Sequence, residues 1–575
     1  MIINKKNFDN YNYKWAIWIC VLFVFEFFLF KRYVSIKVEN FYPAQFDQAA
    51  YLPLFYRTYE AIQKQGFISG LVNSPTLANA ILFPIQASIS FLIFGASRFN
   101  ALLINFVYLI ALQLYCILTV KAVFKKSYLA ILFLGMFLCI NAPFSRESGG
   151  LFDVRTDLIA FCAYGIFVCS VIRSQFFLDR KWSVLSALMA CLTILLRTIT
   201  LVYFSGIIAC LLVYLLFKQI KGFHAQTVIH KENKTRLVNL ILFCVSIAII
   251  AVPWVWMNKE ALYNYYVVGH ILNGEKYIRA LEAGITNTWQ SIFYYSHSLL
   301  FIHIGNLALT FFISLFLLYS LLHIIYKKYN PSFFSSQKSR STITMNTETW
   351  RMGTIFLLAS IFVPMIILTL DVSKSPIVAN IMVTPTIWLF FWYYAYIDSR
   401  IGPKERRDSL FKKLAIILLL IGLVNMTHEL LVRHSKRQLK DLPVITKMYL
   451  DIGNYITMKK WQTPNIGFDQ VCDYLTSGGI ETLYYESRGK LLNLGVNARL
   501  GGSIFAITEK DALAGLQSVN VLIINLNNNY PKSFYPYNQT ILPLRSVIIN
   551  YAENHFKILG DYQFKNAIYR VYVAN

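Results

Sequence analysis

The stretch of sequence on which the predicted fold depends spans residues 41–51 and reads FYPAQFDQAAY. It follows the first apolar run of the chain, residues 14–31, so we expect it to lie at a membrane surface. Asp47 is the first acidic residue after Glu39, and its neighbours are apolar, aromatic or amide side chains. A carboxylate in such surroundings can serve as a base, and it can equally cap a helix.

Composition predicts a polytopic α-helical membrane protein. Of the 575 residues, 56% are hydrophobic and 14% are charged, whereas soluble proteins carry about 25% charged residues. The first apolar run lacks the short core and cleavage site of a signal peptide, so we expect it to be retained. A span needs roughly 20 apolar residues. On that basis about eleven spans are expected, at residues 14–31, 99–120, 127–141, 157–172, two within 183–217, 237–256, 300–326, 352–370, 377–397 and 414–430.

The distribution of basic residues predicts the orientation of these spans. Residues 77–95 are apolar but interrupted by Pro84 and Gly95, so we place them in the interface. One set of loops then holds 22 Lys and Arg residues and the opposite set holds 7, the richer loops being 121–126, 173–181, 218–236, 327–351 and 400–413. Basic loops stay in the cytoplasm, so Asp47 and the C-terminal part are expected to face outward. The net charge of +25 is thereby explained without a nucleic-acid partner.

Composition also divides the chain in two. Residues 1–430 are expected to form the membrane domain, with a first outer loop at 32–98, and residues 431–575 a soluble α/β domain. In the second part, runs typical of strands alternate with helical stretches, the strands at 481–485, 519–526 and 567–573 and the helices at 468–475 and 510–516. Eight of the nine cysteines lie in or beside apolar runs and no CxxC pair occurs, so no disulfide frame is predicted.

Ionisable residues near a membrane tend to mark function, and several lie on the expected outer side. Besides Asp47, the candidates are Arg57 of the first loop, Asp153, Arg155 and Asp157 of the second, Arg197 between two apolar runs, Tyr265 and His270 of the loop 257–299, and Lys374. In such a group, a carboxylate can deprotonate an acceptor hydroxyl while cations bind the phosphate of a lipid-linked donor.

Each candidate also has an ordinary structural interpretation. Asp47 and Asp157 precede helical runs, where Asp commonly caps a helix. Arg197 and Lys374 can extend toward the interface, and the tyrosines can form an interfacial belt. His270 has no partner at the spacing of a metal site, so no metal ligand is assigned, although a divalent ion remains open as a cofactor.

Taken in order, these motifs resemble the GT-C superfamily of membrane glycosyltransferases. The nearest likenesses are the protein O-mannosyltransferases and the lipid A aminoarabinose transferases. The similar segments are residues 46–51 of the first loop, Ser74-Pro75 and 92–99 of the juxtamembrane segment, 156–161 of the second loop, the basic break 195–198 and the late loop 373–375 with Pro385. The first motif of the family commonly holds two acids, whereas Gln48 occupies the second place here.

The resemblance implies an enzyme of the inner (plasma) membrane that acts on its outer, periplasmic face. Such an enzyme moves a sugar from a polyprenyl-phosphate donor to lipopolysaccharide, another glycolipid or a protein. It implies Asp47 as the base. In our interpretation, Asp153 and Asp157 assist acceptor or sugar binding, and Arg155, Arg197 and Lys374 bind the donor phosphate. Two other functions remain open: a transporter or flippase of a lipid-linked sugar, and a polymerase or ligase of surface polysaccharide. The absence of a repeat between the two halves of the sequence favours the enzyme over the transporter.

Overall fold

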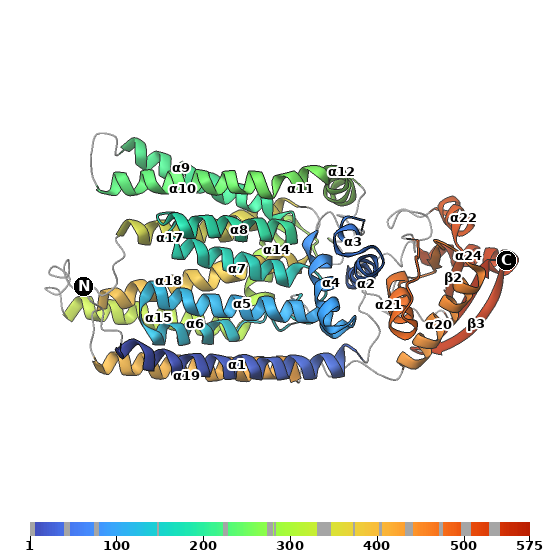
Figure 1. Cartoon of the computed structure of the whole chain (residues 1–575), viewed down its shortest axis with the longest axis horizontal. Coiled ribbons are helices and arrows are strands. Elements are labelled where there is room, and N and C mark those ends of the chain that lie inside the picture. The colour runs from blue at the N-terminus through green and yellow to red at the C-terminus, as the bar shows by residue number, and fades with distance from the viewer. Residues whose placement is uncertain are drawn as a thin grey trace.

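The computed structural model shows a bundle of long helices with a small α/β domain at one end (Figure 1). We call that end of the bundle the domain end. The structure describes residues 6–39, 47–73, 80–145, 149–221, 228–272, 280, 283–329, 347–371, 374–401, 405–431, 441–470, 475–495, 508–527 and 541–574.

The long helices of the bundle run along one common direction (Figure 1). They are α1 (Lys6–Lys37), α5 (Arg98–Phe124), α6 (Ser127–Leu138), α7 (Asp157–Arg173), α8 (Arg180–Leu196), α9 (Thr200–Lys221), α10 (Val228–Ile250), α15 (Asn306–Tyr329), α17 (Thr347–Leu370), α18 (Val383–Ile401) and α19 (Glu405–Leu431). Each matches an expected apolar run. Among the described residues, six helices are long and apolar enough to cross a membrane, or seven if one bent pair is a single span. The protein is therefore a multi-pass membrane protein, and the number of eleven spans stays a prediction.

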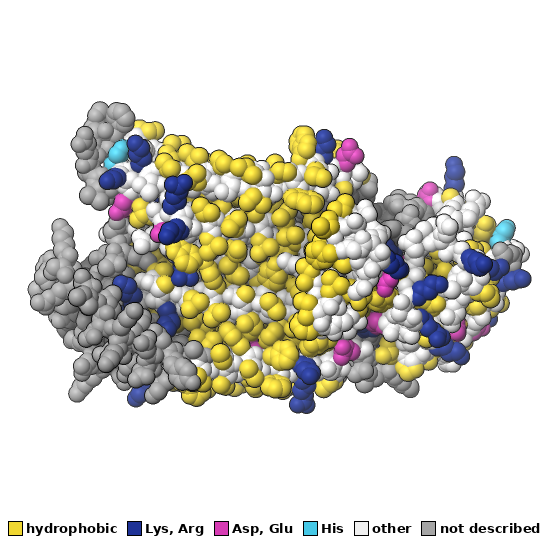
Figure 2. Space-filling view, in the orientation of Figure 1, with side chains coloured by type: hydrophobic (Ala, Val, Ile, Leu, Met, Phe, Trp, Pro, Cys, Tyr) yellow, Lys and Arg dark blue, Asp and Glu magenta, His cyan; other side chains and the backbone are white. Residues whose placement is uncertain are grey.

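The surface between the two ends of the bundle is apolar. Figure 2 shows hydrophobic side chains over the long helices, with charged side chains at the ends and on the C-terminal domain. Trp18, Val213 and Phe362 are examples, each more than half exposed. Helices suit this environment because they satisfy their own backbone groups where no water is present.

Short helices close the domain end. α2, for example, lies across the direction of the long helices (Figure 1). The short elements are α2 (Asp47–Gln65), α3 (Phe67–Asn73), α4 (Leu82–Phe94), α11 (Val252–Met257), α12 (Lys259–Tyr263), η2 (Asn264–Leu272), α14 (Thr288–His297), η3 (Ser298–Ile304) and η5 (Pro376–Met382). The segment expected in the interface is α4, an apolar helix of 13 residues. Residues 41–46 and Ser74-Pro75 lie outside the described residues.

One expected span is broken near its start. The run expected at 300–326 begins in η3 and turns by 95° before α15. The turn is at Gly305, whose φ of 85° is unfavourable for other residues. A Cβ on Gly305 would also lie 2.5 Å from the Asn141 side chain. The bend therefore brings η3 against the loop that follows α6.

The C-terminal domain is a four-stranded sheet with helices on both faces. Its strand order is β1-β2-β4-β3, with β1 (Ile466–Phe468) parallel to β2 (Val521–Asn525) and β4 (Ala567–Ala574) antiparallel to both β2 and β3 (Phe556–Phe564). Side chains of β2 alternate between the faces. Val521 and Ile523 pack with α20 (Leu442–Lys459) and α21 (Ser477–Arg488), and Leu522 and Ile524 with α22 (Glu509–Ser518) and α24 (Arg545–His555).

The expected strand at 481–485 is wrong, because this segment lies inside α21. The hydroxyl of Thr476 accepts a hydrogen bond from the N–H of Gly479 at 2.9 Å and starts the helix. Ile480, Leu483 and Tyr484 then share one helical face in the core of the domain. The expected strands at 519–526 and 567–573 and the helix at 510–516 are confirmed as β2, β4 and α22. Of the helix expected at 468–475, the first residue belongs to β1 and residues 471–474 are not described.

A strained turn joins α7 to α8. Gln175, Phe176 and Phe177 have φ values of 52°, 59° and 68°, a left-handed conformation that costs roughly 1–2 kcal/mol per residue. Arg236 of α10 donates to the carbonyls of Gln175 and Phe176 at 2.5 and 3.0 Å. Asn239 donates to that of Phe177 at 2.8 Å. Burial of the two phenylalanine side chains and these hydrogen bonds hold the turn.

Because Gln175 is exposed, Gln175→Gly removes the backbone strain without removing a buried side chain. We expect the variant to gain up to about 1 kcal/mol of stability. A thermal-unfolding midpoint measured in detergent tests this, with Gln175→Ala as the control that keeps the Cβ. A midpoint lower for glycine than for alanine would contradict the explanation.

Candidate functional site

The second loop, the bent helix pair and the late loop meet at the domain end. The N–H groups of Asn141 and Ala142 donate to the carbonyl of His303 at 3.0 and 2.8 Å. The His303 ring, through Nε2, lies 2.6 Å from the carbonyl oxygen of Pro376. A Cβ on Gly149 would lie 2.7 Å from the Ile377 side chain, so η5 packs closely against the second loop. Three segments far apart in sequence thus build one surface.

Asp157 and Arg197 form an ion pair at this end of the bundle. Asp157 opens α7 and Arg197 follows α8, and Arg197 Nη1 lies 2.5 Å from Asp157 Oδ1. Nη1 also lies 3.4 Å from the hydroxyl of Thr156. The expected break at 197–200 is confirmed: α8 ends at Leu196, and α9 begins at Thr200. A buried carboxylate at a helix start thereby orients a cation.

The side chain of Arg197 is only partly covered. Its side chain is 23% exposed, against 7% for Asp157. Tyr266 of η2 lies close enough for electrostatic interaction with it, and burial raises the pKa of Tyr266 to about 12 despite the opposing cation. The Tyr266 hydroxyl is therefore protonated near neutral pH. Tyr265 packs edge to face on Tyr266, with ring centroids 4.9 Å apart, and is itself exposed.

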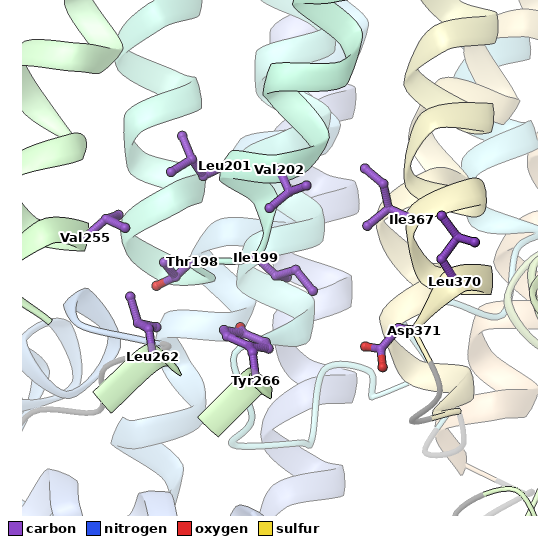
Figure 3. Close-up of a pocket in the computed structure, with 10 residues that line it drawn as sticks. All are labelled: Thr198, Ile199, Leu201, Val202, Val255, Leu262, Tyr266, Ile367, Leu370 and Asp371. Carbon is purple, nitrogen blue, oxygen red and sulfur yellow. The ribbon is translucent and has the colours of Figure 1, made fainter. Parts of the chain in front are cut away.

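A cavity of about 510 Å³ begins at Thr198, the residue after Arg197, and lies between α9, η2 and α17 (Figure 3). Seven of its ten lining residues are apolar; the lining consists of Thr198, Ile199, Leu201, Val202, Val255, Leu262, Tyr266, Ile367, Leu370 and Asp371. Figure 3 shows the carboxylate of Asp371 directed toward the side of the cavity on which Tyr266 lies. The cavity therefore combines a long apolar wall with polar groups at one end.

Asp371 was missed as a candidate in the sequence. The signal was present, because this acid directly follows the apolar run 352–370. Tyr203 of α9 was also missed, since it lies within an apolar run; it is buried near Arg197 and Tyr266. Only the tertiary packing of α9 against α17 and η2 brings these residues together.

Asp153 and Arg155 form a turn before α7 that is held by hydrogen bonds between the two residues. Asp153 Oδ1 accepts the backbone N–H of Arg155 at 2.9 Å, and Oδ2 accepts from the Arg155 guanidinium, with the Nε contact at 2.7 Å. Asn105 donates to the carbonyl of Asp153 at 2.6 Å. These contacts match the structural alternative for Asp153, a turn residue whose acid pairs with the neighbouring cation.

Lys374 lies at the carboxyl end of α17. Its ammonium donates to the carbonyls of Thr369 and Asp371, both at 2.7 Å, and of Leu368 at 3.3 Å. It also lies 5.2 Å from the ring centroid of Tyr295. Burial lowers the pKa of Lys374. These carbonyls lack helical donors, so Lys374 satisfies the end of the helix.

The remaining candidates lie on other elements. Asp47 is the first residue of α2, a position that suits a helix terminus as well as a base. His270 lies in η2, and the structure describes the side chain of neither residue. Arg57 of α2 pairs with Glu481 of α21 in the C-terminal domain. Within the described part of the chain, no three His, Cys, Asp or Glu side chains are grouped so that they could hold a metal ion.

The architecture is that of a polytopic helical membrane protein with a C-terminal α/β domain, as predicted. Among solved structures it is similar to ArnT from Cupriavidus metallidurans in the apo state, with a TM-score of 0.52 and 12% identity. ArnT from the same organism bound to undecaprenyl phosphate gives a TM-score of 0.50 and 11% identity. Each comparison covers 97% of this chain and 98% of the other. No protein-family model and no curated protein matches the sequence.

Asp157→Asn tests the ion pair that holds Arg197. The substitution leaves a partly buried guanidinium without its carboxylate, and a hydrogen bond to a charged group contributes about 1.5–3 kcal/mol. We expect a clearly lower thermal midpoint in detergent. Asp561→Asn is the control, because it breaks the exposed pair with Arg570, which contributes at most about 1 kcal/mol. Equal shifts in the two variants would contradict a structural role for the buried pair.

Proposed function

We propose that the protein is a membrane glycosyltransferase that moves a sugar from a polyprenyl-phosphate donor to an acceptor hydroxyl. One observation carries the proposal: a partly exposed arginine, held by a buried carboxylate, adjoins a large apolar cavity at one end of a membrane bundle. A polyprenyl phosphate has the matching chemistry, since it joins a phosphate to a long apolar chain. The likeness to ArnT bound to undecaprenyl phosphate supports this choice of donor.

Arg197 is the residue to which we assign the donor phosphate. Its guanidinium presents several N–H groups in a fixed plane, which suits bidentate binding of phosphate oxygens. Lys374 donates to three carbonyls and Arg57 pairs with Glu481 of the C-terminal domain, whereas the pair of Arg197 and Asp157 adjoins the apolar cavity. The tail then lies against the apolar lining, and Tyr266 and Asp371 can hydrogen-bond to hydroxyls of the sugar.

Asp47 is the proposed base of the reaction. Its helix, α2, lies across the domain end of the bundle (Figure 1). Arg197 follows α8 at the same end. Asp47 takes the proton of the acceptor hydroxyl, whose oxygen forms a bond to the anomeric carbon of the sugar. The bond from that carbon to the phosphate oxygen breaks, and Arg197 stabilises the charge on the departing phosphate. Asp157 orients Arg197 throughout.

The acceptor and the orientation are part of the same proposal. We propose that the domain end faces the outer, periplasmic side of the inner membrane, because the loops at the opposite end hold most of the basic residues. The acceptor would then be a lipopolysaccharide, another glycolipid or a protein on that side. Asp153 and Arg155 lie in the second loop at this end and would border the acceptor.

Asp47→Asn is expected to reduce turnover by about 10²–10⁴, because an amide cannot take the proton of the acceptor. The measurement is sugar transfer by purified protein in detergent, with undecaprenyl phosphate binding as a check on folding. Asp179→Asn, which removes an exposed acid at the start of α8, is the control and is expected to retain full activity. Full activity of Asp47→Asn would exclude Asp47 as the base.

Arg197→Gln is expected to weaken binding of undecaprenyl phosphate by about tenfold or more, since a hydrogen bond to a charged group contributes about 1.5–3 kcal/mol. Arg197→Lys keeps the charge but loses the planar group. Its affinity for undecaprenyl phosphate should therefore lie between those of the wild type and Arg197→Gln. Arg351→Gln is the matched control because Arg351 is exposed near the other end of α17. Unchanged affinity in Arg197→Gln would contradict the assignment of the donor phosphate.

A further inference from the structure

Helix α21 of the C-terminal domain rests directly on α2, the helix that begins with Asp47. A Cβ built on Gly478 would lie 1.7 Å from the carbonyl oxygen of Ala49, so only glycine fits at this contact. Ala49 is two residues from Asp47. The C-terminal domain therefore packs closely against the first turn of α2.

The first turn of α2 lacks one of its own backbone hydrogen bonds. Pro53 lies inside α2, and proline has no N–H to donate to the carbonyl four residues earlier. The carbonyl in question is that of Ala49, the same group against which Gly478 packs. The helix is thus weakened by its own sequence where the C-terminal domain contacts it.

A buried ion pair fixes the contact further along α2. Arg57 pairs with Glu481 of α21, whose side chain is 4% exposed. The same carboxylate accepts the backbone N–H of Leu494 at 2.8 Å. Burial raises the pKa of Glu481, and the Arg57 cation opposes this shift. Arg57 therefore supplies the positive charge that stabilises the buried carboxylate of Glu481 in the C-terminal domain.

A second acid of α21 contacts two elements of the bundle. Glu486 Oε1 and Oε2 accept from Arg98 of α5 at 2.7 and 2.6 Å, and Oε1 also accepts from the Tyr56 hydroxyl at 2.9 Å. Arg98 in turn donates to the carbonyl of Val38, just after α1, at 2.9 Å. The ring of Tyr485 stacks on that of Tyr56, with centroids 4.4 Å apart. These contacts tie α21 to α2 and to the adjoining ends of α1 and α5.

We propose that α21 is a positioning element of the transfer reaction: it holds the first turn of α2 and so places Asp47 against the acceptor. The inference rests on the proposed function. Its positioning residues are Gly478, Glu481 and Glu486, none of which touches a substrate. The C-terminal domain is then a part of the catalytic scaffold, although its own sheet carries none of the reacting groups.

Gly478→Ala tests the proposal with the smallest change. The added methyl displaces the first turn of α2, and a misplacement of about 1 Å can reduce a rate by about 10²-fold. We expect kcat to fall by about 10–100-fold with an unchanged KM for the polyprenyl-phosphate sugar. Amide hydrogen exchange in residues 49–58 should be faster than in the wild type. Glu486→Gln should behave in the same way.

Two control variants make equivalent changes, glycine to alanine and acid to amide, at positions away from the contact between α21 and α2. Gly560→Ala adds a methyl in β3, where the nearest atom is the end of the Tyr562 side chain, and Asp561→Asn removes an exposed acid on the same strand. Both are expected to match the wild type in kcat and in exchange. Arg57→Ala removes the cation that pairs with Glu481 and is expected to lower kcat. Arg57→Lys keeps a cation at this position and should retain most of the wild-type kcat.

The outcomes separate the inference from the proposed function. If the wild type transfers sugar and Gly478→Ala has the same kcat, the positioning role of α21 is wrong while the proposed function stands. If Arg57→Ala raises the donor KM with unchanged exchange in α2, Arg57 binds substrate and the inference is again wrong. If the wild-type protein transfers no sugar from any polyprenyl-phosphate donor, the proposed function itself fails, and the positioning role fails with it.

Discussion

Lipid offers no hydrogen bonds to a protein backbone, and this constraint arranges the whole molecule. The middle of the bundle is built from helices that satisfy their own backbone groups and present apolar side chains to lipid (Figure 2). Irregular backbone collects at the ends, where water or other protein groups can satisfy it. The break at 197–200, the bend at Gly305 and the loop before η5 all follow this rule. A site with polar chemistry is therefore expected at an end of the bundle, and the cavity next to the break at 197–200 lies at the domain end.

At that end, several charged groups have partners within the protein. Arg155 pairs with Asp153, Arg57 with Glu481, and Lys374 with the carbonyls that end α17. The pair of Arg197 and Asp157 differs, because it adjoins the apolar cavity that begins at Thr198. This difference directs the proposed donor phosphate to Arg197. The contact of α21 with α2 then explains how a separate domain can matter to a reaction at the membrane surface.

The sequence predicted what depends on local pattern. Apolar runs of helical length located the long helices. Arg197, a basic residue that interrupts an apolar run, located the end of α8. It failed where tertiary packing decides: aromatic residues at 481–485 suggested a strand, yet Ile480 and Leu483 share a helical face buried in the domain core. The partner of Arg57 lies 424 positions away, and Asp371 meets Tyr266 only through the packing of α17 and η2. No local pattern in the sequence reveals either contact.

The most direct test of the proposed function is mass spectrometry of polyprenyl-phosphate sugars and envelope glycans from cells that contain or lack this protein. The proposed function predicts that cells without it accumulate one sugar-charged carrier and lose the same sugar from one glycan. That result would also identify donor and acceptor together. Identical carrier lipids and glycans in the two cell lines would contradict a glycosyltransferase that uses a polyprenyl-phosphate donor.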